Sequence, residues 1–138
     1  MDVRMEHTEG LGRVAEVWVK GNLLTVCDGV SSAERRCPPG LTDNVKFIYV
    51  NEAGFNWDDA VRGNPSRRRI LEPVRKWAYV GYGQVVAVMP VVVEFGLLRM
   101  EDANWTSDES LVGKYVRIPI DRLEIVPAVE ADWPEGAR

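Results

Sequence analysis

The chain has 138 residues, the size of one domain, and 46% of them are hydrophobic and 28% charged. This ordinary globular balance argues against a disordered or fibrous protein. The longest apolar run, Val85–Val93, is about half the length of a membrane-spanning helix and contains Pro90. The first ten residues have no apolar stretch, so we expect no signal peptide, no membrane contact and a cytoplasmic location.

The net charge of −4 conceals a basic segment in the middle of the chain. Residues 62–76 carry six Arg or Lys side chains against Glu72 alone, whereas the parts before and after this segment are acidic. An acidic protein does not attract polyanions over its whole surface. Any binding of nucleic acid must therefore be local to residues 62–76.

Cysteine and histidine are scarce, since only Cys27, Cys37 and His7 occur. These three residues cannot complete a four-ligand zinc site without a carboxylate, and no local motif pairs His7 with a nucleophile. Carboxylates alone, such as Glu94 with Asp102, have no spacing that supports catalysis. We therefore predict no metal, no cofactor and no catalytic residues.

The first predicted elements form a β-hairpin. Residues 13–20 and 23–27 are rich in β-branched and aromatic side chains, and Gly21-Asn22 between them is typical of a primed turn. A long polar loop over residues 28–44 follows. Alternation over residues 45–50 then predicts a third strand.

Asn56 is placed to cap a short helical turn that ends at Gly63. The basic segment from Ser66 to Lys76 fits either a short helix interrupted at Pro73 or an irregular loop.

Strands return after this segment. The valine-rich run 84–94 predicts a strand buried on both faces and bent at Pro90. Gly96 allows a tight turn, and residues 115–120 and 122–125 alternate as two strands joined near Asp121.

About seven short strands predict an all-β protein, and a small closed or partly open β-barrel removes strand edges most economically. We also expect one short helix and long loops. If the helix is inserted between strands, the barrel is OB-like. We expect a flexible N-terminus at residues 1–10, a single barrel domain at 11–127 and a flexible tail at 128–138.

The candidate ligand-binding residues are basic and aromatic: Arg67, Arg68, Arg69, Arg75, Trp77 and Tyr79. If residues 75–79 are extended, the two-residue period of a strand places Arg75, Trp77 and Tyr79 on one face. Aromatic rings beside cations suit single-stranded nucleic acid, whose bases stack and whose backbone is anionic. The leading hypothesis is a non-enzymatic binding module for single-stranded nucleic acid, with a phosphate-bearing, nucleotide-like ligand second.

An alternative is a structural or scaffold subunit. The chain has five tryptophans, and Trp105 and Trp133 lie in polar segments. Exposed aromatic side chains commonly anchor protein partners. This alternative predicts binding of protein partners, or a homo-oligomer, through strand edges and tryptophans.

A third hypothesis comes from the segment Asp108-Glu109-Ser110-Leu111-Val112-Gly113. It resembles the Asp-x-Ser-x-x-Gly element of PilZ domains, which are small β-barrels that bind cyclic di-guanylate. The Arg-x-x-x-Arg element of that family has no match, because no two arginines here stand four apart. The resemblance covers six residues and implies a cyclic dinucleotide sensor.

Overall fold

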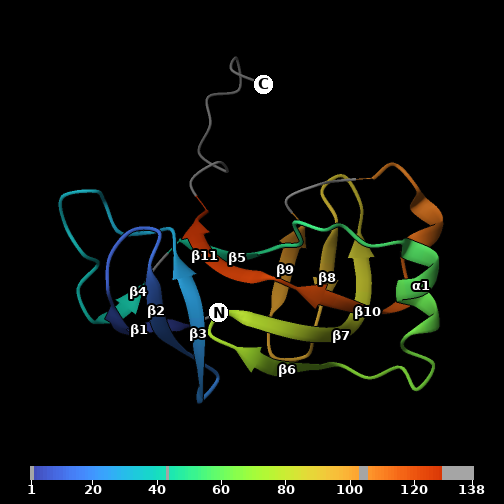
Figure 1. Cartoon of the computed structure of the whole chain (residues 1–138), viewed down its shortest axis with the longest axis horizontal. Coiled ribbons are helices and arrows are strands. Elements are labelled where there is room, and N and C mark those ends of the chain that lie inside the picture. The colour runs from blue at the N-terminus through green and yellow to red at the C-terminus, as the bar shows by residue number, and fades with distance from the viewer. Residues whose placement is uncertain (1, 43, 103–105, 129–138) are drawn as a thin grey trace. The chain divides into compact units, whose positions relative to one another are not determined.

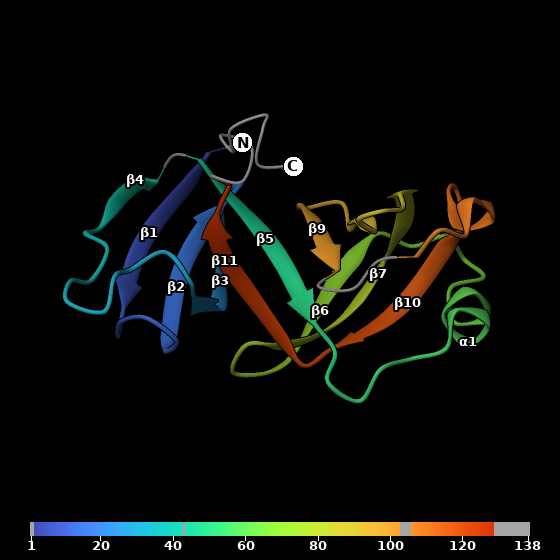
Figure 2. The ribbon, with the colours of Figure 1, turned by 90° about the horizontal axis from the view of Figure 1, so that it is seen from above.

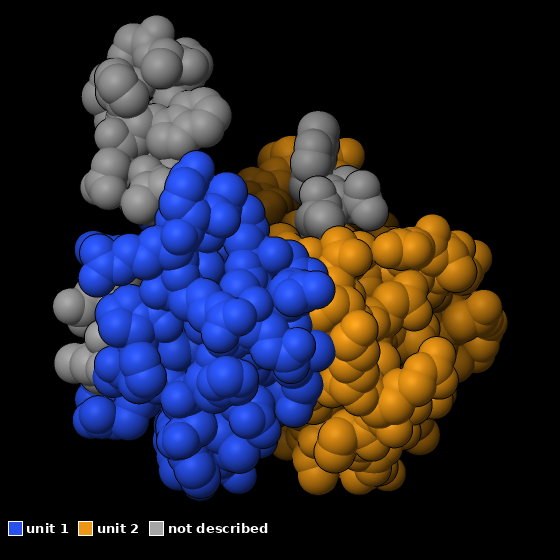
Figure 3. All heavy atoms as spheres, turned by 60° about the vertical axis from the view of Figure 1, so that its left-hand side comes forward, with its two compact units in different colours: residues 1–46, 125–138 blue, residues 47–124 orange. Residues whose placement is uncertain are grey.

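The computed structural model describes residues 2–42, 44–102 and 106–128 (Figure 1). Over these residues the protein is all-β with one short α-helix, which confirms the predicted class. The chain forms two compact units, residues 1–46 with 125–138 (unit 1) and residues 47–124 (unit 2), coloured separately in Figure 3. A single domain was expected from the sequence. None of the helices in the described ranges is long and apolar enough to cross a membrane.

Two strands contribute residues to both units: β5 (Val45–Val50) and β11 (Arg122–Pro127). The other strands of unit 1 are β1 (Val3–Thr8), β2 (Val14–Val19), β3 (Asn22–Asp28) and β4 (Gly40–Thr42). Their order is β4-β1-β2-β3-β11. The β2–β3 hairpin confirms the sequence prediction, but its turn is Lys20-Gly21, one residue earlier than expected. Both turn residues have positive φ, at 48° and 79°.

The segment expected as a flexible N-terminus, residues 1–10, contains a strand. Residues 3–8 form β1, which pairs with β2 on one side and with β4 on the other. Val3 and Met5 alternate with charged residues and are fully buried. Only these two apolar side chains and Thr8 face inward, too short a pattern to stand out in the sequence. The predicted tail at 128–138 lies outside the described residues from position 129 onward.

A buried carboxylate holds the loop that follows β3. Asp28 is 1% exposed, and it accepts hydrogen bonds from the hydroxyls of Thr8 and Ser31 and from the amides of Val30 and Ser31. Burial raises the pKa of the Asp28 carboxyl, but these hydrogen bonds outweigh it and leave the pKa below its ordinary value. Cys27 is buried and Cys37 is half-buried, and no disulfide joins them.

Unit 2 contains the helix and most of the remaining strands. Its elements are α1 (Trp57–Arg62), β6 (Ile70–Arg75), β7 (Ala78–Ala87), β8 (Val92–Glu94), β9 (Arg99–Asp102), the 3₁₀ helix η1 (Glu109–Leu111) and β10 (Tyr115–Ile120). The strand order is β10-β7-β8-β9-β5, and β6 pairs with β7. Figures 1 and 2 show β6, β7 and β10 side by side, with α1 next to β10.

Neither unit closes into a ring. Among the described strands the order ends at β4 in unit 1 and at β10 in unit 2. The closed barrel and the OB-like arrangement are therefore not confirmed.

Asn56 caps α1 as predicted, since its side-chain oxygen accepts from the amides of Asp58 at 2.8 Å and Asp59 at 3.3 Å. The basic segment is neither a helix nor an irregular loop over its second half, because residues 70–75 form β6. Pro73 is tolerated there because β6 has only β7 as a partner among the described strands.

The valine-rich run is not one bent strand. It divides into β7 and β8, and Pro90 lies in the turn between them. In this turn Met89 has a positive φ of 59° and its peptide bond to Pro90 is cis. The glycine turn at Gly96, with φ of 91°, and the alternation of β10 and β11 agree with the sequence predictions.

Two glycines set the orientation of β7. A Cβ atom on Gly81 would lie 2.4 Å from the ring of Phe95, and one on Gly83 would lie 2.4 Å from the carbonyl oxygen of Glu94. Phe95 is fully buried. Glycine at 81 and 83 therefore lets the core pack directly on the β7 backbone, and Tyr82 between them faces the other side of the sheet.

Candidate functional site

The arginines at 67–69 lie in the connection between α1 and β6, and Asn64 fixes its conformation. The Asn64 side chain is 3% exposed. Its Oδ1 accepts from the amide of Arg68 at 2.8 Å, and its Nδ2 donates to the carbonyl oxygens of Arg68 at 3.0 Å and Val116 at 3.1 Å. These bonds tie the connection to β10 and support a left-handed conformation at Arg67, whose φ is 55°. Asn64 is thus a positioning residue for the arginines.

Two tyrosines on neighbouring strands provide the surface beneath these arginines. Tyr82 of β7 is paired with Arg117 of β10, and Gln84 is paired with Tyr115. The intervening residues face the core, because Val116 is fully buried. Strand alternation therefore places all four of the paired side chains on the outer face of the sheet.

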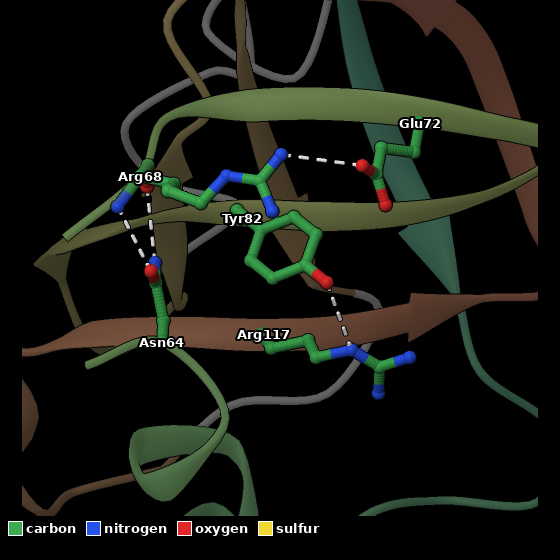
Figure 4. Close-up of polar contacts among 5 residues, drawn as sticks. All are labelled: Asn64, Arg68, Glu72, Tyr82 and Arg117. Atoms are coloured by element: carbon green, nitrogen blue, oxygen red, sulfur yellow. Dashed lines mark hydrogen bonds and ion pairs between the residues drawn. The ribbon is translucent and has the colours of Figure 1, made fainter. Parts of the chain in front are cut away.

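Arg68 and Arg117 both lie next to Tyr82, Arg68 beside its ring and Arg117 at its hydroxyl (Figure 4). The guanidinium carbon of Arg68 lies 4.5 Å from the ring centroid, and that of Arg117 lies 6.0 Å from it. The Nε of Arg117 also donates to the Tyr82 hydroxyl at 3.3 Å. Arg68 forms an ion pair with Glu72 at 3.2 Å, in which both side chains are nearly half exposed. An exposed pair of this kind stabilises the fold only slightly, but it offsets the charge of Arg68.

Arg67 and Arg69 share the ring of Tyr115. Their guanidinium carbons lie 5.8 and 5.6 Å from its centroid. Arg69 also donates to the side-chain oxygen of Gln84 at 2.5 Å and to the Tyr115 hydroxyl at 3.3 Å. These partners are neutral, so they orient the guanidinium without cancelling its charge. We call Arg67, Arg68, Arg69, Arg117, Tyr82 and Tyr115 the arginine–tyrosine patch.

The second half of the predicted site is separate from this patch. Lys76-Trp77 forms the turn between β6 and β7, with Arg75 paired to Ala78, so residues 75–79 are not one extended segment. Lys76 has a positive φ of 48°, and its ammonium lies 4.0 Å from the centroid of the Trp77 ring. The expected common face of Arg75, Trp77 and Tyr79 is therefore wrong.

Tyr79 is 4% exposed and belongs to the core, so it is not available to a ligand. Arg75 and Trp77 remain on the surface, beside a cleft of about 470 Å³ that Glu52 and Asp121 also line. These two carboxylates offset part of the positive charge of Arg75, Lys76 and Arg122 in the same lining, so this cleft attracts an anion less than its cations alone would.

Sequence reasoning missed Asn64, Tyr82, Tyr115 and Arg117. One signal was available, because Tyr115 and Arg117 stand two apart in a predicted strand and so share a face. Their distance in sequence from the basic segment concealed the contact, which depends on the pairing of β10 with β7 and of β7 with β6.

No known protein family, curated protein or solved structure matches the chain. In the segment that resembles PilZ domains, Asp108 caps η1 by accepting from the amide and the hydroxyl of Ser110, at 3.1 and 2.5 Å. These two side chains satisfy each other within a turn.

The carboxylates considered for an enzyme also have structural partners. Glu94 accepts from the amide of Gly96 at 2.6 Å and from Arg99 at 3.1 Å. Asp102 accepts from the hydroxyl of Tyr49 at 3.0 Å. Burial and the Asp102 carboxylate raise the pKa of Tyr49 well above 10.0, so this phenol stays protonated as a hydrogen-bond donor.

Proposed function

We propose that the protein is a non-enzymatic binding module whose arginine–tyrosine patch contacts the backbone of single-stranded nucleic acid. One observation carries the proposal: four arginines from the α1–β6 connection and β10 converge on two tyrosine rings of the same sheet face. Among the described residues, only Arg68 of these four has a carboxylate partner. The patch therefore keeps a concentrated positive charge on a protein that is acidic overall.

The contacts with the rings prepare the arginines for phosphates. A guanidinium that lies against an aromatic ring keeps its N–H donors at the edge of its own plane, where a phosphate can accept from two of them. Holding the side chain in place beforehand lowers the conformational entropy lost on binding. The Arg68 contact, at 4.5 Å, is the shortest of these.

The form of the patch favours a single strand over a duplex. It lies on the outer face of a sheet, and recognition of a duplex commonly uses an element that enters a groove. A single strand can follow the sheet face with its phosphates on the arginines, and a base can stack on the half-buried ring of Tyr115, whose arginine contacts are longer than that of Tyr82 with Arg68. A nucleotide-like ligand is the second candidate for the same residues.

The proposal is tested by fluorescence anisotropy with labelled oligothymidylate. We expect saturable binding that weakens as the salt concentration rises, because neutralised phosphates release counterions. The charge-reducing variant Arg117→Gln should bind more weakly, whereas Arg4→Gln, which removes an exposed arginine of β1, should bind as the wild type does. Absence of salt-sensitive binding would refute the proposal.

A scaffold role is a second proposal, favoured by β6. Ile70 and Val74 of this strand are 42% and 55% exposed, and among the described strands β6 pairs only with β7. An exposed apolar edge strand is a surface on which another chain can add a strand. Light scattering over a concentration series tests self-assembly, and a strict monomer would count against it.

A further inference from the structure

A cleft next to the arginine–tyrosine patch has the size and lining of a small-ligand site. Its volume is about 500 Å³, and its lining includes Val61, Pro65, Arg67, Gln84, Lys114 and Tyr115. Sites for small molecules commonly have volumes of roughly 300–1,000 Å³. Only Arg67 and Tyr115 of this lining belong to the patch, so the cleft extends the charged surface toward α1.

The charges of the lining distinguish this cleft from two others of similar size. Arg67 and Lys114 are its ionisable cations, and none of the described residues that line it is a carboxylate. The cleft beside Trp77 has two acids in its lining, and the cleft of unit 1 that contains Arg35 and Arg36 also has two. Of these three clefts, only the cleft of Arg67 and Lys114 has no carboxylate among its described lining residues to repel an anion directly.

The uncharged part of the lining suits a planar group. Val61 and Pro65 contribute apolar surface, and Tyr115 contributes an aromatic ring. Gln84 is fixed at both ends of its amide, because its Nε2 donates to the carbonyl oxygen of Gly113 at 3.1 Å and its Oε1 accepts from Arg69. Part of the cleft surface is thus held in place before any ligand arrives.

We propose that this cleft binds a single nucleotide unit, with its phosphate between Arg67 and Lys114 and its base against the ring of Tyr115. The inference rests on the proposed function and specifies the ligand at one end of the patch. Arg67 and Lys114 have no carboxylate partner among the described residues, so both charges are available to a phosphate. The nucleotide unit is either a free nucleoside monophosphate or the phosphorylated end of a strand.

Calorimetric titration of the full chain with AMP at low salt tests the site. We expect saturable binding of AMP and at least about tenfold weaker binding of adenosine, because charge-assisted hydrogen bonds to phosphate are lost. Lys114→Gln and Arg67→Asn should each weaken AMP binding by at least about tenfold. Both side chains are exposed, and asparagine tolerates the left-handed backbone at position 67, so the fold should be retained.

The matched control is Arg117→Gln, which changes the patch outside the cleft lining. It should weaken binding of oligothymidylate more than it weakens binding of AMP, and Arg4→Gln, outside the patch, should leave both unchanged. Equal affinity for AMP and adenosine, or AMP binding that both cleft variants retain, would overturn the inference. If oligothymidylate binds but AMP does not, the cleft proposal fails and the patch proposal survives, whereas absence of both contradicts the two together.

The source of the nucleotide is distinguished with oligothymidylates that carry a phosphate at the 5′ end, at the 3′ end or at neither. Tighter binding of one phosphorylated form, lost in Lys114→Gln, supports a strand end as the ligand. Equal binding of the three forms, together with AMP binding, supports a free nucleotide.

Discussion

Replacing Arg69 by glutamine removes one uncompensated charge from the arginine–tyrosine patch, and the size of its effect follows from the ion pairs of the patch. Four cations of the patch and its cleft, Arg67, Arg69, Lys114 and Arg117, have no carboxylate partner among the described residues. Arg68 is balanced by Glu72 at 3.2 Å. For a single strand, the slope of log K against log salt is about −0.7 for each phosphate neutralised.

Four cations therefore predict a slope of about −2.8, so a fourfold rise in salt, from about 50 to 200 mM, should weaken oligothymidylate binding about 50-fold. Arg69→Gln should reduce the slope to about −2.1 and the loss to about 20-fold. Glu72→Gln releases Arg68 and should steepen the slope to about −3.5. The two variants thus change the salt dependence in opposite directions.

Anisotropy titrations of the wild type, Arg69→Gln, Glu72→Gln and Arg4→Gln over this salt range measure the four slopes. Arg4→Gln should reproduce the wild-type slope, because Arg4 is an exposed residue of β1 outside the patch. The reasoning is refuted if the wild-type slope is near zero, or if Arg4→Gln lowers the slope as much as Arg69→Gln does.

Three further predictions concern the residues that hold the fold and the patch. Asn64→Ala leaves the buried carbonyl oxygen of Val116 without its side-chain donor. It should lower the free energy of unfolding, measured in urea, by about 1–3 kcal/mol, and it should weaken oligothymidylate binding. If neither quantity changes, Asn64 is not a positioning residue. Gly81→Ala places a Cβ 2.4 Å from the ring of Phe95, and it should lower the free energy of unfolding in the same assay by about 1–3 kcal/mol. An unchanged free energy of unfolding would show that the Phe95 side chain can move to accommodate the methyl group. The carboxyl of Asp28 has a pKa lowered from 3.8, so its stabilisation is present above pH 3.8 and is lost as the pH falls through the folded-state value. Asp28→Asn should therefore be less stable than the wild type at pH 7, and the difference should shrink in urea titrations below pH 3.8; a constant difference would count against the hydrogen-bonded carboxylate.

Local features could be predicted from the sequence wherever a single segment determines them. The β2–β3 hairpin, the Asn56 cap and the alternation of β10 each depend on neighbouring residues, and the structure shows all of them. Predictions failed where the backbone adopts a positive φ without glycine or asparagine. Lys76 makes the β6–β7 turn and Met89 the β7–β8 turn, and neither residue signals a turn.

The candidate site was predicted only in part, because it depends on pairing between distant strands. The charge of residues 67–69 is visible in the sequence, but their ring partners come from β7 and β10. Tyr79 illustrates the opposite error: it is close to the arginines in the chain, yet strand alternation turns it into the core. The register that decides which tyrosine faces outward is set by the packing of Phe95 against Gly81 and Gly83.

The most direct test of the central claim is an NMR titration of ¹⁵N-labelled protein with oligothymidylate, following backbone amides and arginine Nε–H groups. We expect the largest shifts at Arg67–Arg69, Tyr82, Tyr115 and Arg117, and the Nε–H signals of the arginines should move with them. Shifts confined to other surfaces, such as Trp18 and Leu23 of unit 1, or no shifts at saturating oligonucleotide, would contradict this claim.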